Sequence, residues 1–348
     1  MMLMPDIPFP KTRYLGSKRK LLGPLFDVFS RLSFETALDP FSGSGSVAYL
    51  LKAMGASVTA GDVMAFNVGA ARALVVNQSQ HIAETVETML VDVGRSSATG
   101  GFIETTFDGL FFLPEENRFL DRTVSWLDGV DGVTRDMALY CVGQAALAKR
   151  PYNLFHRANL NMRVREVTRS FGNKTTWETP FETLIRRYAE EVDRAVFSSA
   201  RPCRAVQADV MAHDPEAYDL VYLDPPYVSG KGAGVDYVDF YHFLDGLAEP
   251  AMWASRIVHR YKHKPLDGRG QSPWCDPATV SDAFRASIER YRRSIMVISY
   301  RSDGIPSIAE LSVMLASVGK RVEVVDVGRY TYALSKNRRS KEIILVAL

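Results

Sequence analysis

The most chemically distinctive stretch of the chain is Asp-Pro-Pro-Tyr at residues 224–227. Proline has a fixed φ and no N–H to donate, so Pro225 and Pro226 make this loop stiff and leave its carbonyl groups without competing donors. The loop presents a carboxylate, rigidly directed carbonyls and the ring of Tyr227. These groups could accept hydrogen bonds from a ligand and offer it a stacking surface, although Asp-Pro-Pro also occurs in ordinary turns.

The residues before this loop predict the element that holds it. Residues 218–223, Tyr-Asp-Leu-Val-Tyr-Leu, carry the β-branched, aromatic and apolar side chains of a buried strand. The prolines end that strand, because neither can continue a ladder of main-chain hydrogen bonds. In open α/β sheets, ligands bind beyond the carboxyl ends of the strands. We therefore expect Asp224 at the ligand-binding edge of a sheet.

A second loop with chemical character lies nearer the N-terminus. Residues 35–54 predict a short strand, a turn of serines and glycines, and a helix. Gly43 and Gly45 would let a ligand approach the main chain closely, while the helix N-terminus adds oriented N–H groups. A further strand at 56–62 ends in Asp62, near the spacing expected of an acid that binds ribose hydroxyls. These features predict a nucleotide pocket.

The same glycines also fit the G-x-G-x-x-A pattern of dinucleotide-binding enzymes, so a dehydrogenase that uses NAD is an alternative. Against it, Asp39-Pro40-Phe41 separates the strand from the glycines, where a dinucleotide turn normally follows the strand directly. A turn that is merely rich in glycine is a further alternative. The strand, helix and acidic residue around the loop favour a binding site.

The segment 11–22 crowds five basic side chains around a tyrosine and a glycine. A basic segment near a terminus is usually just solvated. The interleaved Tyr14 and Gly16 better suit a loop that closes over an anionic group.

Together these motifs resemble those of the Dam-like adenine-specific DNA methyltransferases, which use S-adenosyl-L-methionine. Segment 11–22 is similar to the family's N-terminal motif, 39–51 to its cofactor-binding motif and 224–227 to its catalytic motif, in the family's order. The resemblance implies that the cofactor is bound by Tyr14, Lys18, Asp39, Phe41, Gly43, Gly45, Asp62 and Asp209. It also implies a catalytic role for Asp224, Pro225, Pro226 and Tyr227.

The implied reaction transfers a methyl group from the cofactor sulfonium to N6 of an adenine that has left the duplex. The lone pair of that nitrogen is delocalised into the ring, so hydrogen bonds accepted from its two N–H groups would favour a nucleophilic, pyramidal form. Asp224 and the Pro225 carbonyl can supply both acceptors, and Tyr227 a stacking surface. Methylation of a cytosine amine uses the same logic, but the corresponding motif then more often begins with serine. Asp224 therefore favours adenine.

The resemblance also implies the fold class. We expect an α/β protein with a Rossmann-like methyltransferase sheet, seven-stranded, mostly parallel and doubly wound, and a mainly helical inserted lobe that recognises DNA. Residues 1–80 and 199–348 would form the catalytic domain, and 81–198 the lobe. Apolar runs at 294–300 and 342–348 predict further strands, and residues 321–330 alternate enough for an edge strand or hairpin.

Residues 149–174 are expected to contact DNA, because arginine, asparagine and aromatic residues are mixed there and Glu166 is the only acid. Basic side chains bind phosphates, and asparagine can bond to base edges. A solvated basic surface is the alternative, but this mixture fits DNA contact better. The predicted contacts are Arg150, Asn153, Arg157, Asn159, Asn161, Arg163, Arg165, Asn173 and Lys174.

A second basic stretch runs from residue 256 to 269 and contains His259 and His263, spaced as a metal-binding pair could be. Cysteine is absent nearby and Asp267 is the one acid, so we expect no metal and favour a segment that contacts phosphates.

Composition sets broader limits. The hydrophobic share of 47% and the net charge of +2 are those of an ordinary soluble globular protein, so any basic surface must be local. Three widely spaced cysteines, with no signal peptide or apolar run of membrane length, indicate a reducing, intracellular setting. The family resemblance implies a cytoplasmic enzyme that is bacterial or phage-borne.

The expected partner is double-stranded DNA rather than a membrane, and a cognate restriction endonuclease could accompany the protein. A monomer is the expected state. Two alternatives are an RNA adenine methyltransferase and a DNA-binding protein that keeps the fold without turnover. The intact Asp224, Tyr227 and glycine motif speak against the second of these.

Overall fold

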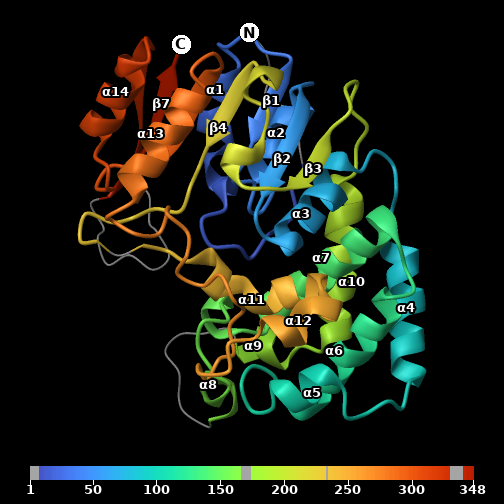
Figure 1. Ribbon diagram of the computed structural model, residues 1–348. Coiled ribbons are helices and arrows are strands. Elements are labelled where there is room, and N and C mark those ends of the chain that lie inside the picture. The colour runs from blue at the N-terminus through green and yellow to red at the C-terminus, as the bar shows by residue number, and fades with distance from the viewer. Residues whose placement is uncertain (1–7, 166–173, 233, 330–339) are drawn as a thin grey trace.

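The centre of the protein is a mostly parallel sheet. The computed structural model describes residues 8–165, 174–232, 234–329 and 340–348, and within them the sheet has seven strands (Figure 1). They lie in the order β3-β2-β1-β4-β5-β7-β6, and only β7 runs against its neighbours. The predicted sheet is confirmed. The strands are β1 (Thr36–Asp39), β2 (Ser57–Asp62), β3 (Arg204–Gln207), β4 (Leu220–Leu223), β5 (Ile295–Arg301), β6 (Val322–Arg329) and β7 (Lys341–Ala347).

An apolar core packs on each face of the sheet. On β4, Leu220 and Tyr222 belong to one core, while Val221 and Leu223 belong to the other. Burial on both faces explains why this strand is continuously apolar rather than alternating. Side chains of α1 (Leu22–Phe29), α2 (Ser46–Ala53) and α3 (Ala65–Ala71) join the first core, and those of α13 (Val280–Arg290) and α14 (Ile308–Ser317) the second.

A helical lobe extends from one end of the sheet (Figure 1). Its central helix is α7, in which every residue from Asp136 to Ala148 is buried. This helix packs against α4, α6 and α10 of the lobe and against α3 beside the sheet. The lobe helices between β2 and β3 are α4 (Ala83–Arg95), α5 (Phe102–Thr106), α6 (Pro114–Leu127), α7 (Gly132–Ala148), α8 (Asn161–Val164), α9 (Lys174–Glu178) and α10 (Phe181–Ala195).

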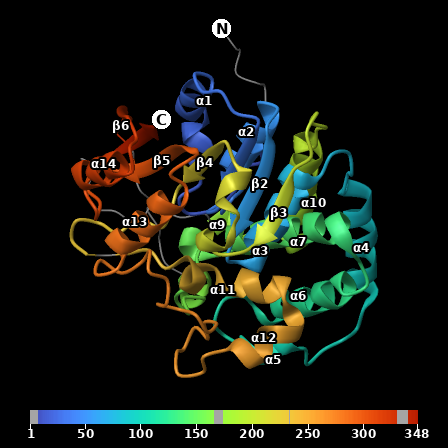
Figure 2. The same cartoon turned by 45° about the horizontal axis from the view of Figure 1, so that its top comes forward.

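Two helices that follow the Asp-Pro-Pro-Tyr motif also pack in this lobe. They are α11 (Tyr237–Ala248) and α12 (Pro250–Arg256), and both views place α12 beside α5 (Figures 1 and 2). Phe243 and Trp253 pack their rings on Phe107, with centroids 5.1 and 5.3 Å away. The lobe is therefore built from two separate stretches of sequence, and the loop after β4 leads directly into it.

Short turns of other helix types complete the described chain. They are η1 (Lys18–Leu21), η2 (Arg72–Val76), η3 (Pro151–Asn153), η4 (Val210–Ala212) and η5 (Pro215–Ala217). Within the described ranges, no helix is both long and apolar enough to cross a membrane.

Candidate active site

Three carboxyl groups meet where parallel strands end. Asp39 is the last residue of β1, Asp62 the last of β2, and Asp224 follows β4. These three strands are neighbours, so their carboxyl ends share one edge of the sheet. All three residues line one pocket, which contains about 890 Å³ of empty space when the open solvent at its mouth is included. Of the other predicted cofactor residues, Tyr14, Lys18, Phe41, Gly43 and Asp209 also line this pocket.

The glycine loop between β1 and α2 forms the floor of the pocket. Gly43 and Gly45 have φ angles of +48° and +76°, which glycine adopts without a steric cost. A side chain at Gly43 would place Cβ only 3.1 Å from the ring of Tyr14. Gly45 is the N-cap of α2 and supports the loop without lining the pocket. The cradle therefore requires the glycines that the sequence motif singled out.

Asp62 anchors this loop and faces the pocket at the same time. Its Oδ2 accepts hydrogen bonds from the Gly43 N–H at 2.9 Å and from Asn67 Nδ2 at 3.1 Å, and its Oδ1 accepts one from the Met64 N–H at 2.9 Å. Burial raises the pKa of Asp62 above its usual value, and these bonds partly oppose the increase. Asn67 also donates to the Tyr14 hydroxyl at 3.0 Å. Sequence reasoning missed Asn67, because nothing marks an asparagine within a helix as a pocket residue.

Of the three acids, Asp39 has the surroundings least favourable to a negative charge. It is 1% exposed, and among the described residues its Oδ1 has no hydrogen-bond partner. Burial raises the pKa of Asp39 well above its usual value, and the nearby Asp224 and Asp62 raise it further. Three acids around one pocket favour a ligand that carries positive charge. A sulfonium-bearing cofactor fits that requirement.

Asp224 belongs to a buried polar cluster. Its Oδ1 lies 2.8 Å from Lys18 Nζ and 2.8 Å from the Tyr227 hydroxyl. Glu342 of β7 completes the cluster, with Oε1 3.4 Å from the same Nζ and 2.9 Å from the same hydroxyl. Burial raises the pKa of Asp224 above its usual value, and Lys18 opposes that increase. The ammonium of Lys18, assigned by resemblance to the cofactor, thus pairs with the Asp-Pro-Pro-Tyr motif. Sequence reasoning missed Glu342, because a charged residue beside Lys341 at the start of an apolar strand does not look like part of a site.

The rest of the Asp-Pro-Pro-Tyr motif surrounds this cluster. Pro226 lines the pocket with Asp224, whereas Pro225 is buried and is not part of the wall. The Tyr227 ring packs edge-on against the Tyr300 ring, with centroids 5.1 Å apart. The Lys18 ammonium lies 4.7 Å from the centroid of the Tyr227 ring. These contacts fix the orientation of the tyrosine.

The outer wall of the pocket comes from segments that the sequence left unassigned. Tyr237, at the start of α11, and Trp274 both line it. The Tyr237 ring stacks on Tyr14 at 5.7 Å, and Tyr14 stacks on Tyr241 at 4.5 Å. Trp274 packs edge-on against Phe41 at 5.0 Å. Stacked and edge-on rings thus connect these segments to Tyr14 and Phe41 beside the glycine loop.

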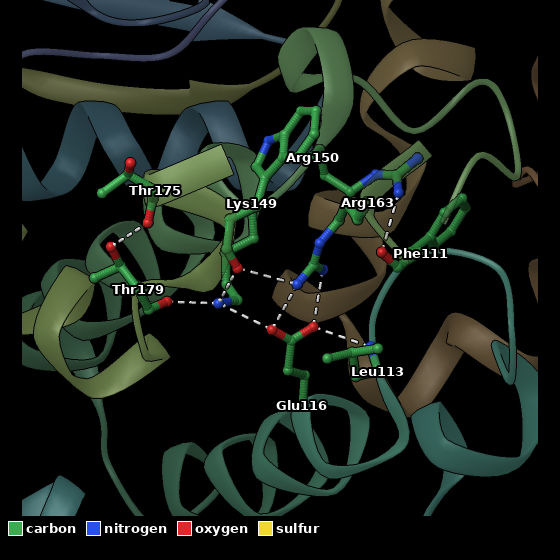
Figure 3. A network of polar contacts seen from close by, with 9 residues as sticks. Phe111, Leu113, Glu116, Lys149, Arg150, Arg163, Thr175 and Thr179 are labelled. Atoms are coloured by element: carbon green, nitrogen blue, oxygen red, sulfur yellow. Dashed lines mark hydrogen bonds and ion pairs between the residues drawn. The ribbon is translucent and has the colours of Figure 1, made fainter. Parts of the chain in front are cut away.

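Two of the predicted DNA contacts are interior residues of the lobe (Figure 3). Arg150 is 1% exposed and donates to the carbonyls of Phe111, Leu154 and Arg157 and to the Asn159 side chain. Arg163 makes two 2.8 Å hydrogen bonds to the Glu116 carboxylate. Neither guanidinium is available to a phosphate in this arrangement, so the expected DNA contact by these two residues is not supported by their positions.

The buried Glu116 joins the network that Arg163 enters. Lys149 Nζ lies 2.9 Å from Glu116 Oε1 and donates to the Trp177 carbonyl at 2.9 Å, which also accepts from Arg163 at 3.1 Å. Burial would raise the pKa of Glu116, but Arg163 and Lys149 outweigh it and leave the pKa below its usual value. The network ties α8 and α9 to α6 and α7.

The other predicted DNA contacts lie in different environments. Asn153 and Asn159 are half-buried, and their side chains accept hydrogen bonds from Arg13 and Arg150. Asn173 lies outside the described residues. Exposed positions are held by Arg157, Asn161, Arg165 and Lys174.

The second basic stretch packs against the lobe. His263 Nε2 lies 2.9 Å from Asp239 Oδ1, and Arg269 Nε donates to the same oxygen at 2.7 Å. Within the ranges that the structure describes, no group of three or more potential ligands is placed to hold a metal ion.

The order of the described strands, with its single reversed strand β7, and the pocket at the ends of β1, β2 and β4 are those of a Rossmann-like methyltransferase fold. Within that class, residues 14–249 match the family of D12 class N6 adenine-specific DNA methyltransferases. The match covers more than half of the chain, and the chain belongs to this family. It is therefore an adenine-specific DNA methyltransferase, as the resemblance implied, and not a dehydrogenase.

A similar protein and a similar solved structure are both methyltransferases by name. The chain is 26% identical to the type II methyltransferase M2.HphI of Haemophilus parahaemolyticus, over 98% of this chain and 97% of that protein. Among solved structures, it is similar to the rRNA methyltransferase aviRa of Streptomyces viridochromogenes, at 16% identity over 99% of this chain and 90% of that one. The TM-score of that pair is 0.29, too low for a structural conclusion.

Replacing Asp39 by asparagine should stabilise the protein at neutral pH while weakening cofactor binding. Because the folded-state pKa of Asp39 is raised, its stabilising contribution is complete at low pH and is lost as pH rises through that pKa. The unfolding temperature of Asp39→Asn should therefore exceed that of the wild type by about 2–4 °C at pH 8 and match it near pH 3. Thermal unfolding at both pH values and calorimetric titration with cofactor test this, and a less stable variant with unchanged affinity would contradict it.

Replacing Arg163 by alanine should destabilise the lobe by about 3 kcal/mol, because it leaves the buried Glu116 with one cation instead of two. Urea unfolding measures this loss. Arg157→Ala, which removes an exposed arginine from the same segment, is the matched control and should stay within about 0.5 kcal/mol of the wild type. Equal stabilities of the two variants would show that the Arg163 pair has no structural role.

Proposed function

We propose that the pocket binds S-adenosyl-L-methionine and that Asp224 receives the N6 amino group of an adenine turned out of duplex DNA. The observation that carries this proposal is the position of Asp224, at the wall shared by the glycine-loop pocket and the Asp-Pro-Pro-Tyr loop. Its Oδ1 is already bonded to Lys18 and Tyr227. The second oxygen, Oδ2, receives no hydrogen bond from the described residues and can accept one from the amine.

Different pocket residues would contact different parts of the cofactor, according to their charge and shape. Gly43 and Gly45 allow the loop to approach the ligand, and Asp62 can accept from ribose hydroxyls with its remaining lone pairs. Asp39 offers negative charge to the cationic part of the cofactor, and Phe41 offers a ring. When bound, the cofactor supplies an electrophilic methyl group on its sulfonium.

Catalysis by the chain itself would be a matter of position and electrostatics. Asp224 Oδ2 and the Pro225 carbonyl each accept one N6–H, which exposes the nitrogen lone pair. The Tyr227 ring, held by its hydroxyl contacts and by Tyr300, offers the base a stacking surface. Once nitrogen is methylated it carries an extra proton, which Asp224 Oδ2 is placed to accept.

The DNA would lie along the exposed part of the basic segment. Arg157 is the best-placed contact, because the residues before it pack on α11. The Phe155 N–H bonds to the Phe240 carbonyl at 2.9 Å, and the His156 ring lies 4.6 Å from Phe240. That helix begins at the pocket wall with Tyr237. Asn161, Arg165 and Lys174 would extend the contact surface.

We include Tyr152 in this proposed contact surface because its side chain is exposed and its backbone conformation is unusual. Its side chain is 59% exposed, and both Tyr152 and Asn153 have positive φ angles, of 63° and 57°. Two successive non-glycine residues in this region store strain, which functional loops often carry. An exposed ring held in this way is suited to stacking on bases.

The biological setting is also a proposal. The relative M2.HphI is named a type II methyltransferase, which supports a role for this chain in restriction and modification beside a cognate endonuclease. We propose that it acts as a monomer.

Replacing Asp224 by asparagine should reduce methyl transfer to adenine by about 10²–10³-fold while changing cofactor affinity by no more than a few-fold. The experiment uses labelled cofactor, mixed-sequence duplex DNA and nucleoside analysis. Asp128→Asn, at an exposed helix end in the lobe, is the control and should retain full activity. Undiminished methyladenine from Asp224→Asn would refute the proposed role of Asp224, and loss of cofactor binding would assign it to the cofactor pocket instead.

Replacing Arg157 by alanine should weaken duplex binding and reduce the slope of log affinity against log salt by about 1, as expected for one lost phosphate contact. Fluorescence titration at several salt concentrations measures the slope. Arg292→Ala is the control, because this exposed arginine precedes β5 and so lies at the amino end of that strand, whereas the pocket lies at the carboxyl ends of β1, β2 and β4. Equal slopes for the two variants would remove Arg157 from the interface.

A further inference from the structure

We infer that Glu342 is a positioning residue for the methyl-transfer reaction, acting on Asp224 through Lys18 and Tyr227. The inference rests on the proposed role of Asp224 as the acceptor for the adenine amine. Glu342 lies in β7, more than a hundred residues after the catalytic motif, and belongs to none of the motifs that the sequence singled out.

Glu342 is held rigidly and buried completely. Its side chain is 0% exposed. Its strand pairs on both sides, with Arg301 of β5 and Gly328 of β6 opposite Glu342. A carboxylate in the middle of a sheet is costly unless its hydrogen bonds and charge are satisfied. Here both conditions are met by groups that also contact the catalytic carboxylate.

The contacts of Glu342 mirror those of Asp224. Lys18 Nζ lies 2.8 Å from Asp224 Oδ1 and 3.4 Å from Glu342 Oε1. The Tyr227 hydroxyl lies 2.8 and 2.9 Å from the same two oxygens. Both bridging groups are therefore shared between the two carboxylates. Since they occupy Oδ1 of Asp224, they turn its Oδ2 toward the remaining space.

The charges in this cluster give Glu342 a second effect. Lys18 alone would neutralise Asp224 and weaken it as an acceptor. With Glu342 present, Lys18 is a cation shared by two anions, so it neutralises Asp224 less completely than it would alone. The negative charge that Asp224 keeps suits a reaction in which positive charge develops on the adenine nitrogen. Glu342 also raises the pKa of Asp224, in opposition to Lys18.

A purely structural role predicts a different behaviour. If Glu342 only satisfied Lys18 in the interior, its replacement would reduce stability without altering how activity depends on pH. If it acts on Asp224, the acid side of the pH–rate profile must move. The titratable and charged groups that face Asp224 are Lys18, Glu342, Tyr227, Asp39 and Tyr222.

The test compares Glu342→Gln with Glu323→Gln, the same substitution at an exposed position on the neighbouring strand β6. Glu342→Gln should lower kcat at least tenfold, with cofactor affinity and KM for DNA within about threefold of the wild type. Removing the Glu342 charge removes an influence that raises the pKa of Asp224. The acid limb of the pH–rate profile should therefore shift to lower pH, while Glu323→Gln leaves both the rate and the profile unchanged.

A second variant guards against a misfolded protein. Glu342→Asp keeps the charge but is one methylene shorter, so it should retain the wild-type acid limb with at least a fivefold lower kcat. An unshifted acid limb in a folded Glu342→Gln, or wild-type kcat in Glu342→Asp, would overturn the inference. If either of these outcomes is found while Asp224→Asn is inactive under the same conditions, only the inference about Glu342 has failed. If Asp224→Asn remains active, the proposed function itself has failed.

Discussion

The ion pair between Lys18 and Asp224 is the contact on which the geometry of the site depends. It joins the N-terminal segment to the loop after β4, two parts of the chain that are more than two hundred residues apart. Both partners are largely buried, so the pair is poorly screened by solvent and salt. The same N-terminal segment brings Tyr14 over the glycine loop and against α11. One ionic contact therefore helps to hold the Asp-Pro-Pro-Tyr loop, the glycine loop and α11 in a fixed relative position.

Much of this arrangement could be predicted, because parallel sheets constrain their sequences strongly. Apolar runs bounded by glycine or proline located β1, β2 and β4, and the carboxyl-edge rule placed Asp224 at the ligand-binding edge. Asp62 was marked by its spacing after the glycines, and Asp39 by the family resemblance. What could not be predicted depends on contacts between distant segments. Nothing in the sequence distinguishes Glu342 from a charged residue at a strand end, or Asn67 from any helical asparagine. The role of Trp274 emerges only when its segment folds over Phe41.

The basic segment shows the opposite limitation. Its composition predicted a surface, yet Arg150 and Arg163 are used inside the lobe, where carbonyl groups and Glu116 satisfy their guanidinium groups. Composition cannot distinguish an arginine that binds phosphate from one that bonds to carbonyl and carboxylate groups inside the lobe, since both occur in loops rich in aromatic residues. Burial decides between them, and burial is a property of the fold. The exposed Arg157 lies in the same segment and shows how closely buried and exposed arginines are interleaved.

The return of α11 and α12 to the lobe has a consequence for engineering. Exchanging target specificity between relatives would require moving two stretches together, the helices between β2 and β3 and the pair after the catalytic loop. A chimaera that carried only the first stretch would leave Phe243 and Trp253 against unfamiliar aromatic partners. Because α11 also begins at the pocket wall, such a mismatch would reach the pocket proposed for methyl transfer as well as the lobe proposed to contact DNA. Under the proposed function, DNA recognition in this protein would not be a separable domain.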